Sequence, residues 1–198
     1  MLKAVIGLGN PGEDYAKTRH NLGYFVLDKF SEKISLTWKV NKFIDASVAC
    51  GFSGKNKIIL IKPLTYMNLS GRSVMLALRF YKIKLDNVLV VYDDFNLDIG
   101  VSKLQNAGAD GGHNGISDII LKNGKEFSRF RLGIKPSYTD NTILSQFVLM
   151  PFTKGETEVI DEVLPIWLES LKLAIDKGVD IAMNFTNKKL KNEYNQNQ

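Results

Sequence analysis

Apolar residues recur along this chain in short segments whose spacing alternates between that of a strand and that of a helix. Short apolar runs rich in β-branched residues indicate strands, whereas apolar positions three or four residues apart indicate helices. Helices are therefore predicted at residues 22–31, 69–81, 116–120 and 159–174. Strands are predicted at residues 2–8, 46–52, 57–61, 88–92 and 130–134, with a weaker one at 142–149.

Turn-forming residues mark where several of these segments end. Residues 53–56 separate two predicted strands with a Gly/Asn turn that suits a hairpin. Pro63 should end the second of these strands because its nitrogen cannot donate to a strand ladder. From Asn187 the chain is rich in Asn, Lys and Gln without an apolar period, which predicts a poorly ordered tail.

The alternation of strands and helices predicts an α/β fold. We expect a single three-layer domain, with a twisted mixed sheet flanked by helices on both faces. Residues 1–186 are assigned to this domain and residues 187–198 to the polar C-terminal tail. No internal repeat or linker divides the chain, and its 198 residues suit one hydrophobic core.

Composition narrows the class of protein without selecting a function. The hydrophobic fraction of 44% and the charged fraction of 24% are usual for a globular protein. No apolar run could span a bilayer and the N-terminus lacks a signal-peptide layout, so we expect no membrane association. Cys50 is the one cysteine, which favours a reducing cytoplasm. The net charge of +5 mildly favours an anionic partner such as nucleic acid.

Polar residues gather in three loops that follow predicted strands. Because functional clefts of α/β sheets lie outside the carboxyl ends of the strands, these loops predict one common site. The residues are Asn10, Tyr15 and His20 in the first loop, Tyr66, Met67 and Asn68 in the second, and Asp93, Asp94, His113 and Asn114 in the third.

His20 and Asp93 form the most plausible chemical pair in these loops. Histidine has an ordinary pKa near 6.5, so its neutral ring can take a proton from water. An aspartate on the far ring nitrogen would hold the tautomer and stabilise the imidazolium. The loops contain no cysteine, and Ser70 lacks a nucleophile elbow, so a water nucleophile fits better than an acyl-enzyme.

The other polar residues of the loops suit the recognition of amide and anionic groups. Asn10, Asn68 and Asn114 can bind amides or polarise a carbonyl. Backbone amides of the glycine-rich segment before Asn114 could hold an anion at a helix start. Together with a histidine-activated water, this combination predicts hydrolysis of an ester or amide.

Each of these residues also has a purely structural explanation. His20 could pack at a helix start, and Asp93 could be a turn or capping residue. Asn68 and Asn114 lie where asparagine is a preferred N-cap, and His113 could hydrogen-bond within its own loop. Only their expected convergence at one edge of the sheet favours a function.

Two other kinds of site deserve comparison with hydrolysis. Residues 7–12 match the G-x-G-x-x-G dinucleotide fingerprint after a strand, but the helical period does not begin there. Asp93, Asp94 and Asp98 could instead hold Mg²⁺ for phosphoryl chemistry, but no Walker A motif accompanies them. Both rank below metal-independent hydrolysis.

Several motifs resemble those of one known family. Residues 7–12, followed by Tyr15 and residues 18–21, closely resemble the opening motif of bacterial peptidyl-tRNA hydrolases. Residues 62–71 resemble their second motif, and Asp93-Asp94 with residues 111–115 resembles the third. The motifs occur in order, and the resemblance extends to about Asn184.

This resemblance implies a monomeric cytoplasmic enzyme that cleaves the ester between a peptide and the 3′ ribose of tRNA. It implies peptidyl-tRNA as the nucleic-acid partner, with no cofactor, no metal and no obligate protein partner. His20 would accept the proton of the attacking water, Asp93 would stabilise its basic form, and Asn10 would discriminate blocked from free aminoacyl ends. The residues implied in substrate or tRNA binding are Tyr15, Tyr66, Asn68, Asn114, Met67, His113, Lys103 and Arg131.

One departure from the family concerns tRNA binding. The family often carries two basic residues on the strand after the acidic loop, which hold a tRNA phosphate. Here Lys103 is present, the companion position is expected to be Gln105, and Arg131 is a further candidate. The alternative functions are a relative that binds RNA without turnover and a nucleotide-dependent oxidoreductase.

Overall fold

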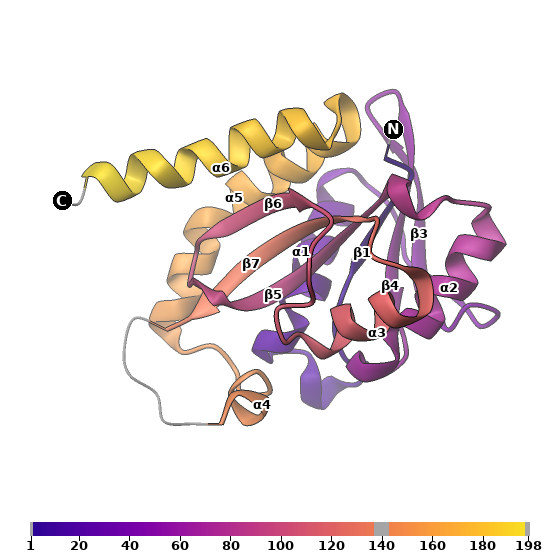
Figure 1. Ribbon diagram of the computed structural model, residues 1–198, viewed down its shortest axis with the longest axis horizontal. Coiled ribbons are helices and arrows are strands. Elements are labelled where there is room, and N and C mark those ends of the chain that lie inside the picture. Colours follow the sequence, from indigo (N-terminus) through magenta and orange to yellow (C-terminus); the bar gives the residue numbers. More distant parts are fainter. Residues whose placement is uncertain (1, 137–142, 197–198) are drawn as a thin grey trace.

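The computed structural model describes residues 2–136 and 143–196 of the chain. The strands within these residues form one sheet, in the order β2-β3-β4-β1-β5-β7-β6 (Figure 1). β4, β1, β5 and β7 are parallel to one another, whereas the pairs β2–β3, β3–β4 and β6–β7 are antiparallel, which confirms a mixed sheet. The strands are β1 (Ala4–Gly7), β2 (Lys39–Asn41), β3 (Ala46–Ser53), β4 (Asn56–Pro63), β5 (Val88–Asp98), β6 (Ser102–Asn106) and β7 (Ser128–Lys135).

Helices cover both faces of this sheet and confirm the predicted three-layer fold (Figure 1). Side chains of β1 alternate between two cores: Val5 packs with α1 and α5, whereas Ile6 packs with α2 and α3. None of the described helices is both long and apolar enough to cross a membrane. The helices are α1 (Leu22–Lys33), α2 (Ser70–Tyr81), α3 (Asn114–Asn123), α4 (Leu144–Phe147), α5 (Lys154–Lys177) and α6 (Val179–Gln196), with short 3₁₀ turns at η1 (Glu13–Tyr15), η2 (Arg19–Asn21), η3 (Met67–Leu69) and η4 (Leu85–Asn87).

The predicted hairpin is present as β3 and β4. Ser53 lies opposite Asn56 at its end, and Gly54 between them has a φ of +58°, a conformation that glycine adopts without strain. Pro63 is the last residue of β4, as predicted. The carboxyl end of β4 therefore delivers the second polar loop to the same edge of the sheet as β1.

The third polar loop differs from its prediction. The strand predicted at residues 88–92 continues as β5 to Asp98, so Asp93 and Asp94 are strand residues that lie opposite Leu132 and Gly133 of β7. β6 follows β5, and the glycine-rich segment leads from β6 into α3. The predicted strand was too short because polar residues from Asp93 onward interrupt the apolar run, although the backbone pairing with β7 continues.

The weak strand predicted at residues 142–149 is wrong. Residues Leu144–Phe147 form α4, and Thr142 lies outside the described residues. Phe147 is buried against the guanidinium of Arg19, and the carbonyl of Val148 accepts the backbone N–H of His20. This segment thus pairs with the first polar loop rather than with the sheet, a contact that local periodicity cannot reveal.

The C-terminal segment also differs from the predicted tail. α6 continues to Gln196 and lies along β6 at the edge of the sheet (Figure 1). The Asn187 side chain donates to the carbonyl of Leu104 and accepts from its N–H, both at 3.0 Å. Asn187 therefore belongs to the folded unit, because it satisfies backbone groups of an edge strand.

Glycines of the first loop allow α1 to pack closely on β1. A Cβ atom at Gly7 would lie 2.5 Å from the carbonyl oxygen of Gly23, and one at Gly9 would overlap the ring of Tyr24. α1 begins only at Leu22, well after these glycines. They therefore serve helix–strand packing and do not place a helix N-terminus beside a bound pyrophosphate, which removes the basis of the dinucleotide alternative.

Candidate active site

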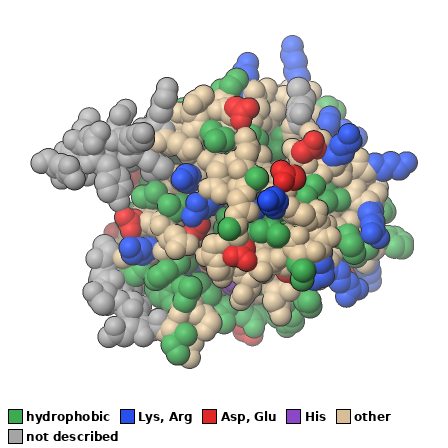
Figure 2. All heavy atoms as spheres, viewed as in Figure 1, with side chains coloured by type: hydrophobic (Ala, Val, Ile, Leu, Met, Phe, Trp, Pro, Cys, Tyr) green, Lys and Arg blue, Asp and Glu red, His purple; other side chains and the backbone are tan. Residues whose placement is uncertain are grey.

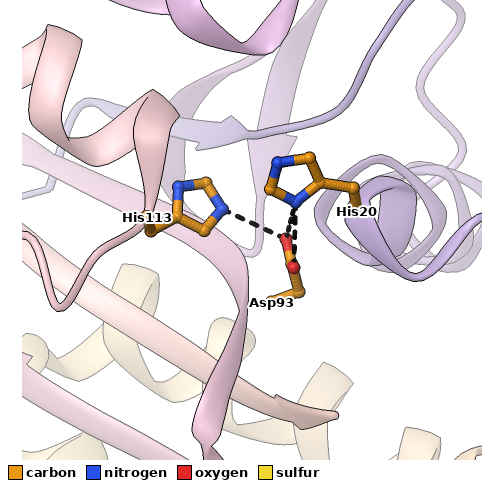
Figure 3. A group of neighbouring side chains, drawn as sticks. All are labelled: His20, Asp93 and His113. Carbon is orange, nitrogen blue, oxygen red and sulfur yellow. Dashed lines mark hydrogen bonds and ion pairs between the residues drawn. The ribbon is translucent and has the colours of Figure 1, made fainter. Parts of the chain in front are cut away.

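Asp93 of β5 lies between two histidines, beyond the last residue of β5 that pairs with β1 (Figure 3). His20 Nδ1 is 3.0 and 2.9 Å from the two carboxylate oxygens of Asp93, and His113 Nε2 is 3.1 Å from one of them. The two rings lie 4.8 Å apart between centroids. Their side chains are at most 9% exposed, so all three groups interact in a largely dry environment.

The hydrogen bonds assign the ring protons. His113 Nδ1 accepts the backbone N–H of Ile116 at 3.3 Å, so Nε2 carries the proton that it donates to Asp93. His20 donates from Nδ1 to Asp93, which leaves the lone pair of the neutral ring on Nε2. That nitrogen has no hydrogen-bond partner among the described residues. His20 can therefore accept a proton from a bound molecule, whereas His113 supports the carboxylate.

Burial and charge act on this pair in opposite directions. Burial alone lowers the pKa of His20 and raises the pKa of Asp93, but their attraction and hydrogen bonds outweigh it. The pKa of His20 is raised above 6.5, and that of Asp93, which also faces His113, falls well below 3.8. Asp93 is thus ionised at neutral pH, and His20 is a stronger base than a free imidazole.

His20 and Asp93 line a cleft of about 340 Å³. Asn114 and the glycine-rich loop form one wall, and Leu144 and Val148 form another. Asp94 and Phe95 complete it from β5. The cleft thus combines one basic nitrogen, polar groups from the start of α3 and an apolar wall, which suits an amide- or ester-containing ligand.

Asn10 connects the first two polar loops. Its buried side-chain oxygen accepts the backbone N–H of Met67 at 2.7 Å. Its own backbone N–H donates to Asn21 Oδ1 at 2.8 Å, and Asn21 Nδ2 donates back to the carbonyl of Asn10 at 2.9 Å. Asn10 Nδ2 has no partner among the described residues. Asn10 therefore offers a ligand an unpartnered hydrogen-bond donor, whereas its amide oxygen already accepts one hydrogen bond.

The remaining predicted residues of these loops differ in whether they are buried, exposed or part of the cleft wall. Tyr15 and Tyr66 meet edge to face, with their centroids 6.3 Å apart, and Met67 is buried. Asn114, the first residue of α3, lines the cleft, whereas Asn68 is exposed in η3 and is not among the described lining residues. Neither asparagine is an N-cap: His113 caps α3, and no side chain caps η3 or α2.

Lys103 and Arg131 are cross-strand neighbours. Lys103 of β6 lies opposite Arg131 of β7, whereas Gln105 lies opposite Arg129. Gln105 Oε1 accepts from Arg131 Nη1 at 3.0 Å. The companion position expected at Gln105 is therefore a support for Arg131, and the two basic side chains that lie together are Lys103 and Arg131. On the face of the molecule drawn in Figure 2, Lys and Arg side chains are interspersed with acidic ones and form no continuous basic surface.

Sequence reasoning missed the residues that hold the first loop in place. Arg19 and Glu156 form a buried ion pair of 2.7 Å, and Arg19 Nη1 also donates to the carbonyl of Pro151 at 2.8 Å. Asn21 is the last residue of the motif at residues 18–21, but nothing in that motif predicts its paired hydrogen bonds with Asn10. No local spacing signals Arg19–Glu156, because the partners are 137 residues apart.

Within the part of the chain that the structure describes, the group of side chains that could hold a metal ion is His20, Asp93 and His113. Their ligand atoms lie within 4.8 Å of one another, whereas Asp94 and Asp98 do not join such a cluster. Binding at His113 Nε2 would move the ring proton to Nδ1, where it would face the N–H of Ile116. A tetrahedral metal would also separate its ligand atoms to about 3.4 Å, farther than the contacts observed. The donor set suits shared protons better than a cation.

Comparisons with known proteins agree on one family. The family model described as peptidyl-tRNA hydrolase matches residues 4–194. A peptidyl-tRNA hydrolase of Clostridium botulinum is 44% identical over 181 residues, covering 91% of this chain and 94% of the relative. One from Fervidobacterium nodosum is 42% identical, with 91% and 93% covered. The crystal structure of the Acinetobacter baumannii peptidyl-tRNA hydrolase superposes with a TM-score of 0.88 at 34% identity and covers 94% of each chain. The chain therefore belongs to the peptidyl-tRNA hydrolase family.

Proposed function

We propose that this protein hydrolyses the ester between a peptide and the 3′ ribose of tRNA, with a water molecule activated by His20. The observation that carries this proposal is the unpartnered Nε2 of His20, on a ring whose Nδ1 donates to the ionised Asp93. A neutral imidazole in this state is a general base with a raised pKa, directed into a cleft.

The proposed reaction needs one proton carrier. The water oxygen attacks the ester carbonyl while its proton passes to His20 Nε2, and Asp93 stabilises the resulting imidazolium. The tetrahedral intermediate then expels the ribose oxygen, which takes the proton back from His20. The products are a peptide carboxylic acid, which then loses its proton to solvent, and a tRNA with an intact 3′ end, and the histidine returns to its neutral starting state.

Asn10 and Asn114 are proposed to orient the substrate. Because Asn10 Oδ1 already accepts from Met67, the unpartnered Nδ2 is the group proposed to meet the ligand, and it can donate to the carbonyl of a peptide bond. A free aminoacyl end lacks that carbonyl and brings an ammonium group that only donates. The site would thus prefer blocked over free aminoacyl-tRNA, since the free form leaves a donor unmet. Tyr15, Tyr66, Met67 and Asn68 are proposed to contact the substrate around this point.

The pH profile should report the His20–Asp93 pair. Because His20 must be neutral to accept a proton, kcat/KM is expected to fall as the pH decreases through the folded pKa of His20. Since that pKa is raised by Asp93, the midpoint should lie above 6.5. In an Asp93→Asn variant the residual activity should have a lower midpoint. A parent midpoint below 6.5 would contradict the proposed tautomer and charge state.

Lys103 and Arg131 are proposed to hold a phosphate of the tRNA. We expect Lys103→Ala or Arg131→Ala to raise KM severalfold while kcat changes less, and to reduce the salt slope of tRNA binding by about one unit. Steady-state kinetics at several salt concentrations measure both effects. Lys57→Ala is the control, because Lys57 is an exposed lysine of β4, which β1 and β5 separate from β7 and β6. A fall in kcat at unchanged KM would refute this positioning role.

The decisive test of function incubates the protein with an N-acetylated aminoacyl-tRNA and excess chelator, beside His20→Ala. The parent should release intact tRNA with and without chelator, and the variant should be slower by about 10² to 10⁴. Loss of activity in chelator would favour a metal mechanism, and equal turnover by the variant would exclude His20 as the base. Binding without turnover would favour the RNA-binding alternative.

Three further properties are proposed with this function. We propose that the protein acts as a monomer, that it works in the cytoplasm and that it uses no cofactor. A monomer is consistent with a cleft in which one chain brings together His20, Asp93, His113 and Asn114.

A further inference from the structure

Arg131, the proposed phosphate ligand, is already paired with a carboxylate. Asp94 Oδ2 accepts from Arg131 Nε at 2.5 Å, and the two side chains are 5% and 18% exposed, respectively. Gln105 occupies Nη1 of the same guanidinium. The third nitrogen, Nη2, has no partner among the described residues. Arg131 is therefore held by two neighbours and presents only part of its hydrogen-bonding edge to a ligand.

Asp94 cannot easily turn away from Arg131. Its other oxygen, Oδ1, accepts the backbone N–H of Asn96 at 2.8 Å and the side-chain amide of Asn96 at 3.0 Å. The same amide reaches the carbonyl of Gly111 at 3.3 Å. These contacts fix a negative charge beside the guanidinium, at the base of the loop that leads to His113.

A fixed carboxylate weakens the attraction of this basic pair for phosphate. Lys103 lies opposite Arg131 across the strand pair, so a phosphate bound between them would also be close to Asp94. At a separation of about 6 Å, repulsion between the two anions lowers affinity by roughly three- to tenfold at the effective dielectric of a wet protein surface. The carboxylate also competes with the phosphate for the guanidinium.

Weaker phosphate binding would have a consequence for turnover. The substrate and the deacylated product carry the same tRNA, so a phosphate contact binds both equally and does not favour the chemical step. A tight contact would then slow product release. We propose that Asp94 limits the affinity of the Lys103–Arg131 pair for an RNA phosphate, so that deacylated tRNA can leave. This inference rests on the proposed function.

The test compares Asp94→Asn with the parent for binding of deacylated tRNA. We expect the Kd, and the Ki of deacylated tRNA in the hydrolysis assay, to fall by about three- to tenfold. Asp98→Asn removes the same charge from the same strand, where the carboxylate faces Lys135, and should leave the Kd unchanged.

A second variant and a double-mutant cycle complete the experiment. Asp94→Ala removes the charge without placing an amide against Asn96, and it should also tighten binding. In an Arg131→Gln background the effect of Asp94→Asn should fall below about twofold, because the phosphate is then no longer held beside Asp94 and no guanidinium remains to compete for. Unchanged or weaker tRNA binding in both Asp94 variants would overturn the proposal, as would a full effect that persists without Arg131.

The cycle also separates this inference from the proposed function. If Arg131→Gln alone leaves the Kd for tRNA unchanged, Arg131 is not a phosphate ligand, and both the tRNA assignment and the inference about Asp94 fail. Ester hydrolysis that depends on His20 is measured independently with the N-acetylated substrate. If the protein does not hydrolyse that substrate, the proposed function itself is overturned.

Discussion

Replacing Asp93 with asparagine should reduce kcat by about 10³- to 10⁴-fold, the range that an equivalent change produces in Ser–His–Asp enzymes. The hydrogen bonds explain why the loss should be large. His113 Nε2–H would still donate to the amide oxygen, which turns the amide NH₂ toward His20. His20 Nδ1 would then have to accept, so the ring proton would move to Nε2, where the lone pair is needed.

The measurement is a single-turnover assay at several pH values. Asp98→Asn serves as the matched control, since it removes a carboxylate from the same strand without contacting either histidine. A loss of less than about tenfold, with the pH midpoint of the parent retained, would mean that the Asp93 carboxylate does not set the tautomer of His20. The mechanism would then need a different base.

The second large effect concerns stability. Arg19→Met should lower the free energy of unfolding by about 3–5 kcal/mol, because it leaves Glu156 as a buried charge without its cation. The guanidinium also packs 4.1 Å from the ring centroid of Phe147 and donates to the carbonyl of Pro151. Denaturant unfolding measures the change. The kcat should also fall, because His20 follows Arg19 and donates its backbone N–H to Val148 of the same segment.

Two controls sharpen this prediction. Combining Arg19→Met with Glu156→Gln should lower the free energy of unfolding by less than the sum of the two single changes. In the double variant no buried charge remains, and the glutamine can still accept from the Thr153 N–H. Lys29→Met breaks an exposed ion pair and should change stability by less than about 1 kcal/mol. Equal effects of Arg19→Met and Lys29→Met would show that the buried pair has no special role.

The hydrophobic pattern was sufficient for most of the fold because burial is periodic along each element. The run at Val88–Tyr92 is apolar on successive residues, and it forms a central strand between two helical layers. The Gly/Asn turn at residues 53–56 likewise determined a hairpin. Where polar side chains continue an element, as at Asp93 and Asp94, the pattern ended too early, since backbone pairing leaves no trace in side-chain type.

The location of the site was predictable for a topological reason. Parallel strands bring their carboxyl ends to one edge, so the loop with His20 and the segment of Asp93, which follows the apolar run of β5, were expected to meet. The partners within that edge were not predictable. His113 was expected to bond within its own loop, and it does cap α3 through Nδ1, but its other nitrogen also reaches Asp93.

The sequence alone determined the layers, the hairpin, the edge of the sheet that carries the site, and the motifs of the family, because these depend on local spacing. Only the tertiary structure decided that Lys103 lies opposite Arg131 and Gln105 opposite Arg129. It also decided that Arg19 pairs with Glu156 and that Asn187 bonds the edge strand at Leu104. The reason is physical: strand register, and contacts between residues 83 and 137 positions apart, are set by the packing of the whole chain, and no single segment encodes them.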